Sequence, residues 1–188
     1  IYVFSHPSNG ADAESWGHDI DGVTVHDVTG TTTGVIYFAL NPTSGTRETR
    51  ATRIRNVTID GHPFSVIHAI NATVEVDGIR SIANAAMTNS CGVLYPINSV
   101  IKGRNVKADY YANTSGTSLV WANIPSASTS EIHLAGVNEW LFDSSAASRM
   151  TLLRRNDATE VIKVDRLELD AAAANTISGS SPTNQLYS

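Results

Sequence analysis

The chain of 188 residues has little cysteine, little charge and no long apolar run, and each shortage excludes a class of protein. Cys91 is the single cysteine, so the chain can form neither an internal disulfide nor a cluster of thiolate metal ligands. Charged residues make up only 16% of the chain and the net charge is −5. A general nucleic-acid binder needs a basic stripe to neutralise phosphates, so this composition disfavours one. No apolar run approaches the roughly 18 residues that a membrane-spanning helix needs.

Familiar catalytic and cofactor motifs are also missing. The sequence contains no phosphate-binding loop, no Gly-rich dinucleotide fingerprint and no HExxH zinc motif, so it indicates no cofactor and no metal site. The amino terminus lacks the basic start and long apolar middle of a signal peptide. The chain opens instead in a predicted strand, Ile1 to Phe4. We therefore predict a single domain over residues 1–188 that belongs to a longer protein.

What the sequence does contain is a repeat. A Gly or Asn followed by an aliphatic residue recurs at intervals of 22 to 34 residues, flanked by alternating apolar residues. The pairs are Gly22-Val23, Asn56-Val57, Gly78-Ile79, Asn105-Val106 and Gly136-Val137, with Arg166-Leu167 as a looser copy. The alternation predicts strands, and the Gly or Asn predicts a bend inside each. His26 and Asp60 occupy one column of adjacent copies, so we expect that they can hydrogen-bond; no nucleophilic Ser stands beside them to complete a triad.

A second set of short apolar segments repeats out of phase with the first. The segments are YFALNP, IHAINA, LYPINS, VWANIP and LLRRND. One column of their alignment is Asn41, Asn71, Asn98, Ile124 and Asn156, and another is Tyr37, Ile67, Leu94, Val120 and Leu152. Asn side chains stacked at a corner can hydrogen-bond from one copy to the next. Each unit therefore holds at least two short strands, a tight corner and a variable polar loop.

Units of this length without a helical period cannot build a sheet with helical crossovers. They suit a parallel β-helix, in which each unit is one coil and the coils stack about 4.8 Å apart. An antiparallel sandwich of many short strands is the alternative, but it gives no reason for columns that persist over five copies. The chain resembles the right-handed parallel β-helix of the pectate-lyase-like superfamily over nearly its whole length. We therefore expect an all-β fold, a right-handed parallel β-helix of about six coils.

Two outward columns of the first block alternate in charge over the first four coils. They are Asp19, Arg53, Glu75, Lys102, His133 and Lys163, and Asp21, Arg55, Asp77, Arg104, Ala135 and Asp165. One interpretation is a self-neutralising ladder on a solvated sheet. The other is that Asp19, Asp21, Glu75 and Asp77 are catalytic carboxylates about 9 to 10 Å apart, near the upper limit for an inverting glycosidase. The intervening Arg residues would keep these carboxylates ionised, which is unfavourable for a general acid.

The second block is apolar on both faces, which leaves open which face points inward. Its alignment places the side chains of one column on one face: Phe38, His68, Tyr95 and Trp121. A parallel strand that is apolar on both sides is normally covered on both sides. The outer cover could be loops, a neighbouring subunit or a sugar chain. Together with Trp16, which stands among acidic residues in the segment SHPSNGADAESWGHDID, the candidate carbohydrate-binding residues are Trp16, His68, Tyr95 and Trp121.

The unequal coil lengths, low charge, abundant Ser, Thr and Asn, and the doubly apolar block resemble a bacteriophage tailspike. The segments WGHDIDG and RIRN match polygalacturonase motifs only in part, and no isolated calcium-binding cluster of the pectate-lyase type is present. The tailspike resemblance implies a homotrimer on the virion tail, outside the cell, that binds a bacterial surface polysaccharide. It also implies depolymerisation by glycoside hydrolase or lyase chemistry, although no catalytic residue carries over. The alternative is a non-enzymatic β-helical adhesin or fibre segment, secreted or on the bacterial surface.

Overall fold

The computed structural model describes eleven stretches of the chain. They are residues 1–4, 17–28, 34–39, 47, 49–61, 65–83, 92–110, 119–124, 129–142, 150–155 and 161–169. Within these stretches the regular structure is entirely β-strand, without a helix. The predicted all-β class is therefore confirmed for the described residues.

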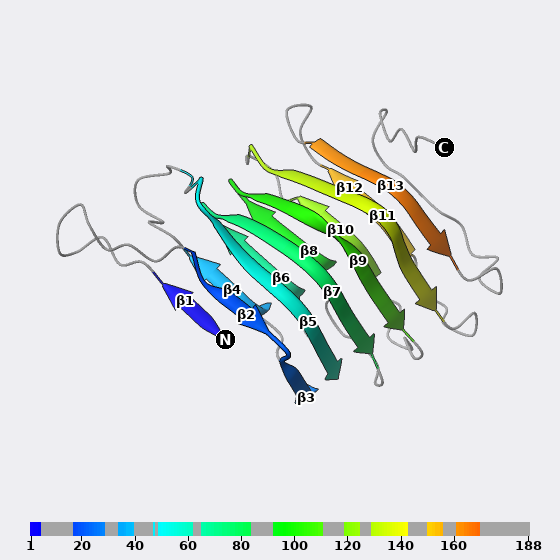
Figure 1. The fold of residues 1–188 in the computed structure, drawn as a ribbon. Helices are drawn as coiled ribbons and strands as arrows, with labels where there is room; N and C mark the ends of the chain where they lie inside the picture. The colour runs from blue at the N-terminus through cyan, green and yellow to red at the C-terminus, as the bar shows by residue number, and fades with distance from the viewer. Residues whose placement is uncertain are drawn as a thin grey trace, which may run out of the picture.

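The strands form two sheets, which lie as two layers in Figure 1. The six-stranded sheet has the order β1-β4-β6-β8-β10-β12. Its strands are β1 (Tyr2–Phe4), β4 (Gly34–Ala39), β6 (Ser65–Ile70), β8 (Gly92–Ile97), β10 (Leu119–Ile124) and β12 (Met150–Arg155). The seven-stranded sheet has the order β13-β11-β9-β7-β5-β2, with β3 also paired to β5. Its strands are β2 (Asp19–Asp21), β3 (Thr24–Val28), β5 (Ala51–Gly61), β7 (Thr73–Ala83), β9 (Val100–Tyr110), β11 (Glu131–Phe142) and β13 (Val161–Leu169).

The chain alternates between the two sheets from β4 onward, and each strand pairs with the strands of the units before and after it. Every strand pair among the described residues is parallel. This pairing excludes the antiparallel sandwich, because a sandwich of that kind joins neighbouring strands by hairpins. The repeat of the sequence is thus a repeat of one short strand and one long strand.

The Gly or Asn of the first repeat is the point at which each long strand bends. Asn56, Gly78 and Asn105 have φ angles of 52°, 73° and 55°, in the left-handed region that Gly and Asn tolerate best. In β5 the buried residues are separated by two positions before the bend, by three across it and by two after it. They are Thr52, Ile54, Val57 and Ile59. The extra residue at the bend therefore lets the apolar side chains point into the core both before and after it.

A second corner, between the short strand and the long strand of a unit, is also built on Asn. Asn71 and Asn98 have φ angles of 53° and 48°. The Asn98 Nδ2 donates a hydrogen bond of 2.7 Å to the Asn71 Oδ1, which confirms the predicted bond between stacked Asn residues. In the next unit the hydroxyl of Thr129 donates to the Asn98 Oδ1 at 2.7 Å, so Thr129 takes the place that the alignment gave to Ile124. Asn41 and Asn156 lie outside the described residues.

The register of the seven-stranded sheet confirms most of the predicted columns. Ile20, Ile54, Val76, Gly103, Leu134 and Val164 are aligned from strand to strand, as are Asp19, Arg53, Glu75, Lys102, His133 and Lys163. The prediction is wrong after Ala135, where β11 has one extra residue in a β-bulge. Val137 was predicted to continue the inward column of Val106, but it is 38% exposed. Asn138 is fully buried, and its Oδ1 accepts a hydrogen bond from the Val106 amide.

The register of the six-stranded sheet corrects the predicted aromatic column. His68 is aligned with Tyr95 as expected, but its partner in β4 is Tyr37, and Phe38 is aligned with Ala69. In β10 the partner of Leu94 is Ala122, so Trp121 is out of step with Tyr95 by two residues. Phe38 and Trp121 therefore do not belong to one column with His68 and Tyr95.

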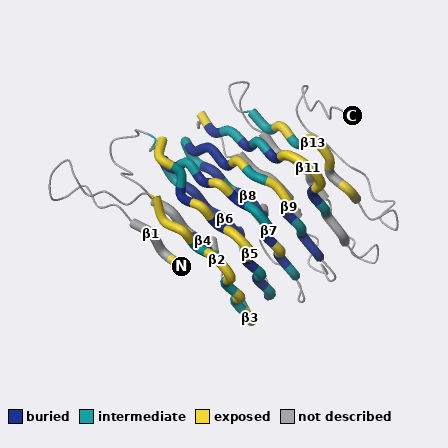
Figure 2. The backbone as a smooth tube through the Cα atoms, in the orientation of Figure 1, coloured by how far each residue is buried: buried dark blue, intermediate teal, exposed yellow. Residues whose placement is uncertain are grey.

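Strand β6 is buried on both faces within the single chain. Val66, Ile67 and Ala69 have no exposed surface, and His68 is only 7% exposed. Figure 2 shows dark-blue buried stretches along the central strands of the two layers. Alternate residues of a strand point to opposite faces, so both sides of β6 are covered by this chain itself. The cover that the doubly apolar pattern requires does not depend on a second subunit at this strand.

Candidate functional site

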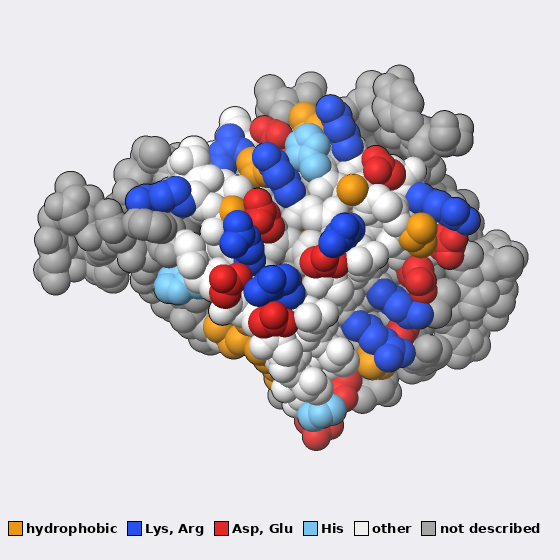
Figure 3. Space-filling view, in the orientation of Figure 1, with side chains coloured by type: hydrophobic (Ala, Val, Ile, Leu, Met, Phe, Trp, Pro, Cys, Tyr) orange, Lys and Arg blue, Asp and Glu red, His pale blue; other side chains and the backbone are white. Residues whose placement is uncertain are grey.

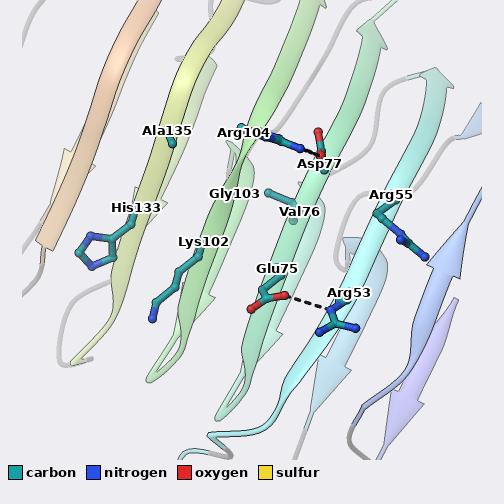
Figure 4. Close-up of a pocket in the computed structure, with 10 residues that line it drawn as sticks. All are labelled: Arg53, Arg55, Glu75, Val76, Asp77, Lys102, Gly103, Arg104, His133 and Ala135. Carbon is teal, nitrogen blue, oxygen red and sulfur yellow. Dashed lines mark hydrogen bonds and ion pairs between the residues drawn. The ribbon is translucent and has the colours of Figure 1, made fainter.

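The described residues include an open pocket of about 460 Å³ on the outer face of the seven-stranded sheet. This face carries interspersed positive and negative side chains in the space-filling view of Figure 3. The pocket crosses four strands, β5, β7, β9 and β11, and Figure 4 shows the residues that line it. They are Arg53, Arg55, Glu75, Val76, Asp77, Lys102, Gly103, Arg104, His133 and Ala135. Four strands about 4.8 Å apart give the pocket a length of about 14 Å along the stack.

Strand alternation and one glycine shape the floor of this pocket. The charged residues alternate with the inward core residues, so β5, β7 and β9 each present two of them on the outer face before the bend, and β11 presents His133 and Ala135 there. Gly103 occupies the core column between Val76 and Leu134. A Cβ atom at Gly103 would lie 1.9 Å from the backbone oxygen of Val76. The two strands can lie this close only because residue 103 has no side chain.

Ion pairs join the charged residues across the strands, as the alternation predicted. The Arg53 Nε lies 3.2 Å from the Glu75 Oε2, and the Arg104 Nη2 lies 2.8 Å from the Asp77 Oδ2. The two remaining predicted carboxylates share one guanidinium. The Arg55 Nη2 lies 3.6 Å from the Asp19 Oδ1 and 3.4 Å from the Asp21 Oδ2. The pocket therefore contains Glu75 and Asp77, while Asp19 and Asp21 lie beyond Arg55 on β2.

The environment of Asp77 favours its ionised form. Hydrogen bonds from Arg104 and from the Asn105 Nδ2, the latter 2.7 Å from the Asp77 Oδ1, lower the pKa of this carboxyl below its ordinary value of 3.8. A general acid for glycoside cleavage needs the opposite shift, toward a raised pKa. Asp77 is thus suited to orient a polar ligand or a neighbouring cation and unsuited to donate a proton.

The charge alternation breaks on β11, where His133 occupies the position at which the pattern would place an acid. The His133 Nε2 lies 2.8 Å from the Glu131 Oε2, and this hydrogen bond lowers the pKa of Glu131. Lys102 and Lys163 flank His133 on the neighbouring strands. Neither lysine has a carboxylate within ion-pair distance among the described residues. In Figure 4, Lys102 and His133 extend from their strands without a bond to the other residues drawn.

Two of the four predicted carbohydrate-binding residues lie away from this pocket. His68 and Tyr95 belong to the other sheet, where their rings pack edge to face with centroids 4.8 Å apart and planes at 88°. Burial lowers the pKa of His68 to about 4, so its imidazole is neutral at physiological pH. Trp16 lies outside the described residues, and the structure describes Trp121 in its backbone only.

A second charged cluster, beyond the bends, was missed by sequence reasoning. Asp109 is fully buried, and its Oδ2 accepts hydrogen bonds of 2.9 and 2.7 Å from Arg80. The Lys107 Nζ lies 2.9 Å from the Glu139 Oε2 and 3.8 Å from the Asp109 Oδ1. The aligned positions of Arg80, Lys107 and Glu139 were a usable signal, but nothing in the sequence indicates that Asp109 is buried.

The possible bond between His26 and Asp60 is confirmed. The His26 Nδ1 lies 2.6 Å from the Asp60 Oδ2, and the Asp27 amide donates to the other carboxylate oxygen at 2.8 Å. This bond raises the pKa of His26 and lowers that of Asp60. No group of three or more metal-ligating side chains occurs in the part of the chain that the structure describes. The contact therefore joins β3 to β5 and is not part of a metal-ligating group among the described residues.

Comparison with known proteins assigns no relative to the chain. No family model, no curated protein and no solved structure matches it. Among its described residues, no helix is long and apolar enough to cross a membrane. The role of the pocket must therefore be argued from the geometry of the pocket itself.

Proposed function

We propose that the chain is a segment of a tailspike-type attachment protein that binds a bacterial surface polysaccharide through the outer face of its seven-stranded sheet. The observation that carries the proposal is the open pocket of about 460 Å³, which runs across four parallel strands and is lined by ion-paired charged side chains. Guanidinium groups donate and carboxylates accept hydrogen bonds, and sugar hydroxyls do both. An elongated open groove suits a linear polymer better than it suits a small metabolite, which is usually enclosed in a pocket.

The architecture in this proposal is a right-handed parallel β-helix of about six coils. Support comes from the chain's alternation between two parallel sheets and from the left-handed residues at both corners of successive units. The hydrogen bond between Asn71 and Asn98, from one unit to the next, is a further support. A scaffold of this kind presents a rigid, extended surface, which lets a polymer bind without ordering the protein.

Binding has more support than cleavage by the four predicted carboxylates. Each of Asp19, Asp21, Glu75 and Asp77 lies within 3.6 Å of a guanidinium nitrogen. The pKa of Asp77 is lowered by its hydrogen bonds, which is the wrong direction for a proton donor, and the other three carboxylates are engaged by arginines. We therefore assign the four residues to binding and to strand pairing. A depolymerase activity of the whole protein would use other groups.

The experiment that tests the proposal is binding of the chain to immobilised bacterial polysaccharides. An array of capsular and O-antigen polysaccharides should yield saturable binding to a subset of structurally related polymers. An absence of binding to every polysaccharide on the array would contradict the proposal. The second candidate, a non-enzymatic fibre segment, is favoured by the ion-pair ladder itself, because such a ladder also stabilises a solvated sheet without any ligand.

A homotrimer, with the polysaccharide-binding faces outward, is part of the tailspike proposal. Light scattering tests it directly, since one chain has a mass of 20.1 kDa. A particle of three times this mass supports the trimer. A monomer would leave the binding face intact, because β6 is already buried within one chain, and would favour the adhesin or fibre alternative.

A further inference from the structure

We propose that the row formed by Lys102, His133 and Lys163, at the β11 side of the pocket, binds a carboxylate group of the polysaccharide. The ligand would then be an acidic polymer that contains uronic acid units. This inference rests on the proposed function and specifies the ligand of the same site. We name this row the lysine row.

The first argument is the interruption of an otherwise balanced pattern. Along this column the residues are Asp19, Arg53, Glu75, Lys102, His133 and Lys163, aligned from β2 to β13. Acids and bases alternate as far as Lys102, and an acid at position 133 would have completed the ladder. His133 at that position leaves two lysines on alternate strands, about 9 to 10 Å apart, without an acid at the aligned position between them.

The second argument is that the nearby carboxylates are already engaged. Glu75 is aligned with Lys102, but its Oε2 is the acceptor for the Arg53 Nε at 3.2 Å. Glu131 is engaged by the His133 ring at 2.8 Å and lies 3.8 Å from the Arg47 Nη1. Asp165 accepts a hydrogen bond of 3.3 Å from the Gly136 amide. Glu131 still interacts electrostatically with Lys102, so the described carboxylates offset the charge of the lysine row only in part, and neither lysine forms an ion pair with them.

The third argument is the position of the row at the pocket. Lys102 and His133 are lining residues, so a carboxylate bound to them belongs to a polymer that continues along the groove. Lysine ammonium groups bind a carboxylate as point charges and do not demand the two-pronged geometry of arginine. The neighbouring Arg53 and Arg104 are held by their own acids and remain available to sugar hydroxyls through their other N–H groups.

The test is an NMR titration of the chain with sodium glucuronate, glucose and glucose 6-sulfate, observed at the lysine side-chain methylene signals. The Lys102 and Lys163 signals are assigned from their loss in the variants Lys102→Gln and Lys163→Gln. Glucuronate should shift both signals in a saturable manner, and equal concentrations of glucose should not. If glucose 6-sulfate shifts the lysine signals by the same amount or more, the row does not prefer a carboxylate to another anion, which would contradict the proposal. Unmoved lysine signals with glucuronate would overturn the proposal.

The matched control is Arg166→Gln, which removes the same charge from an exposed side chain further along β13, where Arg166 pairs with Glu168 at 2.7 Å. On the polysaccharide array, Lys102→Gln should weaken binding to acidic polymers about fivefold to tenfold, and Arg166→Gln should weaken it less than twofold. Equal losses in the two variants would indicate general electrostatic attraction and would overturn the specific site. Binding confined to neutral polymers would refute the lysine row while supporting the proposed function. Binding to no polymer would refute the proposed function.

Discussion

The two sheets of this chain are built by the same repeating unit, yet they differ in burial and charge. Strand β6 of the six-stranded sheet is buried on both faces, and its only titratable side chain is His68. The seven-stranded sheet buries one face and presents charged side chains on the other (Figure 3). The difference indicates that ligand binding belongs to the outer face of the seven-stranded sheet, whereas the inner face of that sheet shares the buried core with the six-stranded sheet. Changes in the six-stranded sheet should unfold the protein, and changes on the charged face should alter binding alone.

The largest expected effect is that of Ile67→Ala in β6. Ile67 has no exposed surface, and removing its side chain leaves a cavity between closely packed strands. We expect a loss of about 3 kcal/mol in the free energy of unfolding, measured by urea denaturation. The control is Val137→Ala, which trims an aliphatic side chain that is 38% exposed and should change stability by less than about 1 kcal/mol. Equal losses in the two variants would contradict the difference between the buried strand β6 and the exposed positions of the seven-stranded sheet.

The next effect concerns His68 and pH. Burial lowers the pKa of His68 from 6.5 to about 4, so the folded protein binds fewer protons than the unfolded chain between these values. The free energy of unfolding should therefore fall as the pH is lowered from 6.5 to 4, by at most about 3 kcal/mol. The variant His68→Phe should lose this pH dependence in urea denaturation series. An unchanged dependence in the variant would show that another group is responsible.

The pKa of His26 is shifted in the opposite direction from that of His68, so its effect on the pH dependence of stability has the opposite sign. Its pKa is raised by Asp60, so its contribution to stability is present below pH 6.5 and is lost as the pH rises through the folded-state pKa. Since His26 is exposed, its contribution should be much smaller than that of His68. The same denaturation series with His26→Ala measures it.

A smaller effect is expected at the Asn corner. Asn98 has a φ of 48° and bonds both to Asn71 and to Thr129. Asn98→Ala should destabilise the protein by about 2 kcal/mol, because alanine disfavours this φ and both bonds are lost. Asn98→Gly should be milder, since glycine adopts positive φ freely. Equal destabilisation by the two variants would show that the φ angle contributes nothing and that the hydrogen bonds alone matter.

The smallest effect on stability is expected on the charged face. Glu75→Gln removes an exposed ion pair with Arg53, and pairs of this kind contribute about 0.2 to 1 kcal/mol. The midpoint of urea denaturation should therefore barely move, and the small difference should diminish in high salt. A loss comparable to that of Ile67→Ala would mean that the charge ladder is a principal source of stability.

The sequence was sufficient for the register of the seven-stranded sheet and insufficient for that of the six-stranded sheet. Outward charges and the Gly or Asn at each bend mark the register of the long strands, because a slip by one residue would bury charge. The short strands are apolar on both faces, so an alignment shifted by one residue fits the apolar pattern equally well. This is why Phe38 was aligned with His68, although its partner is Ala69. The bulge at Val137 was also hidden, because valine suits an inward position equally well.

The candidate site was predicted in part for similar physical reasons. The alternating ladder placed Glu75 and Asp77 correctly beside Arg53 and Arg104, since residues aligned across parallel strands must be neighbours. The pocket itself could not be predicted, because its shape depends on how long side chains from four strands pack over Val76 and Gly103. The burial of His68 depends on packing from distant parts of the chain, which no local pattern encodes.

The most direct test of ligand binding on the charged outer face is hydroxyl-radical footprinting of the chain with and without a polysaccharide that binds it. Footprinting reports which side chains lose solvent access in the complex. We predict protection of His133 and of the lining residues of the pocket, while Tyr95 in the six-stranded sheet keeps its reactivity. Protection of Tyr95 with His133 unchanged would place the ligand on the other sheet and contradict the account.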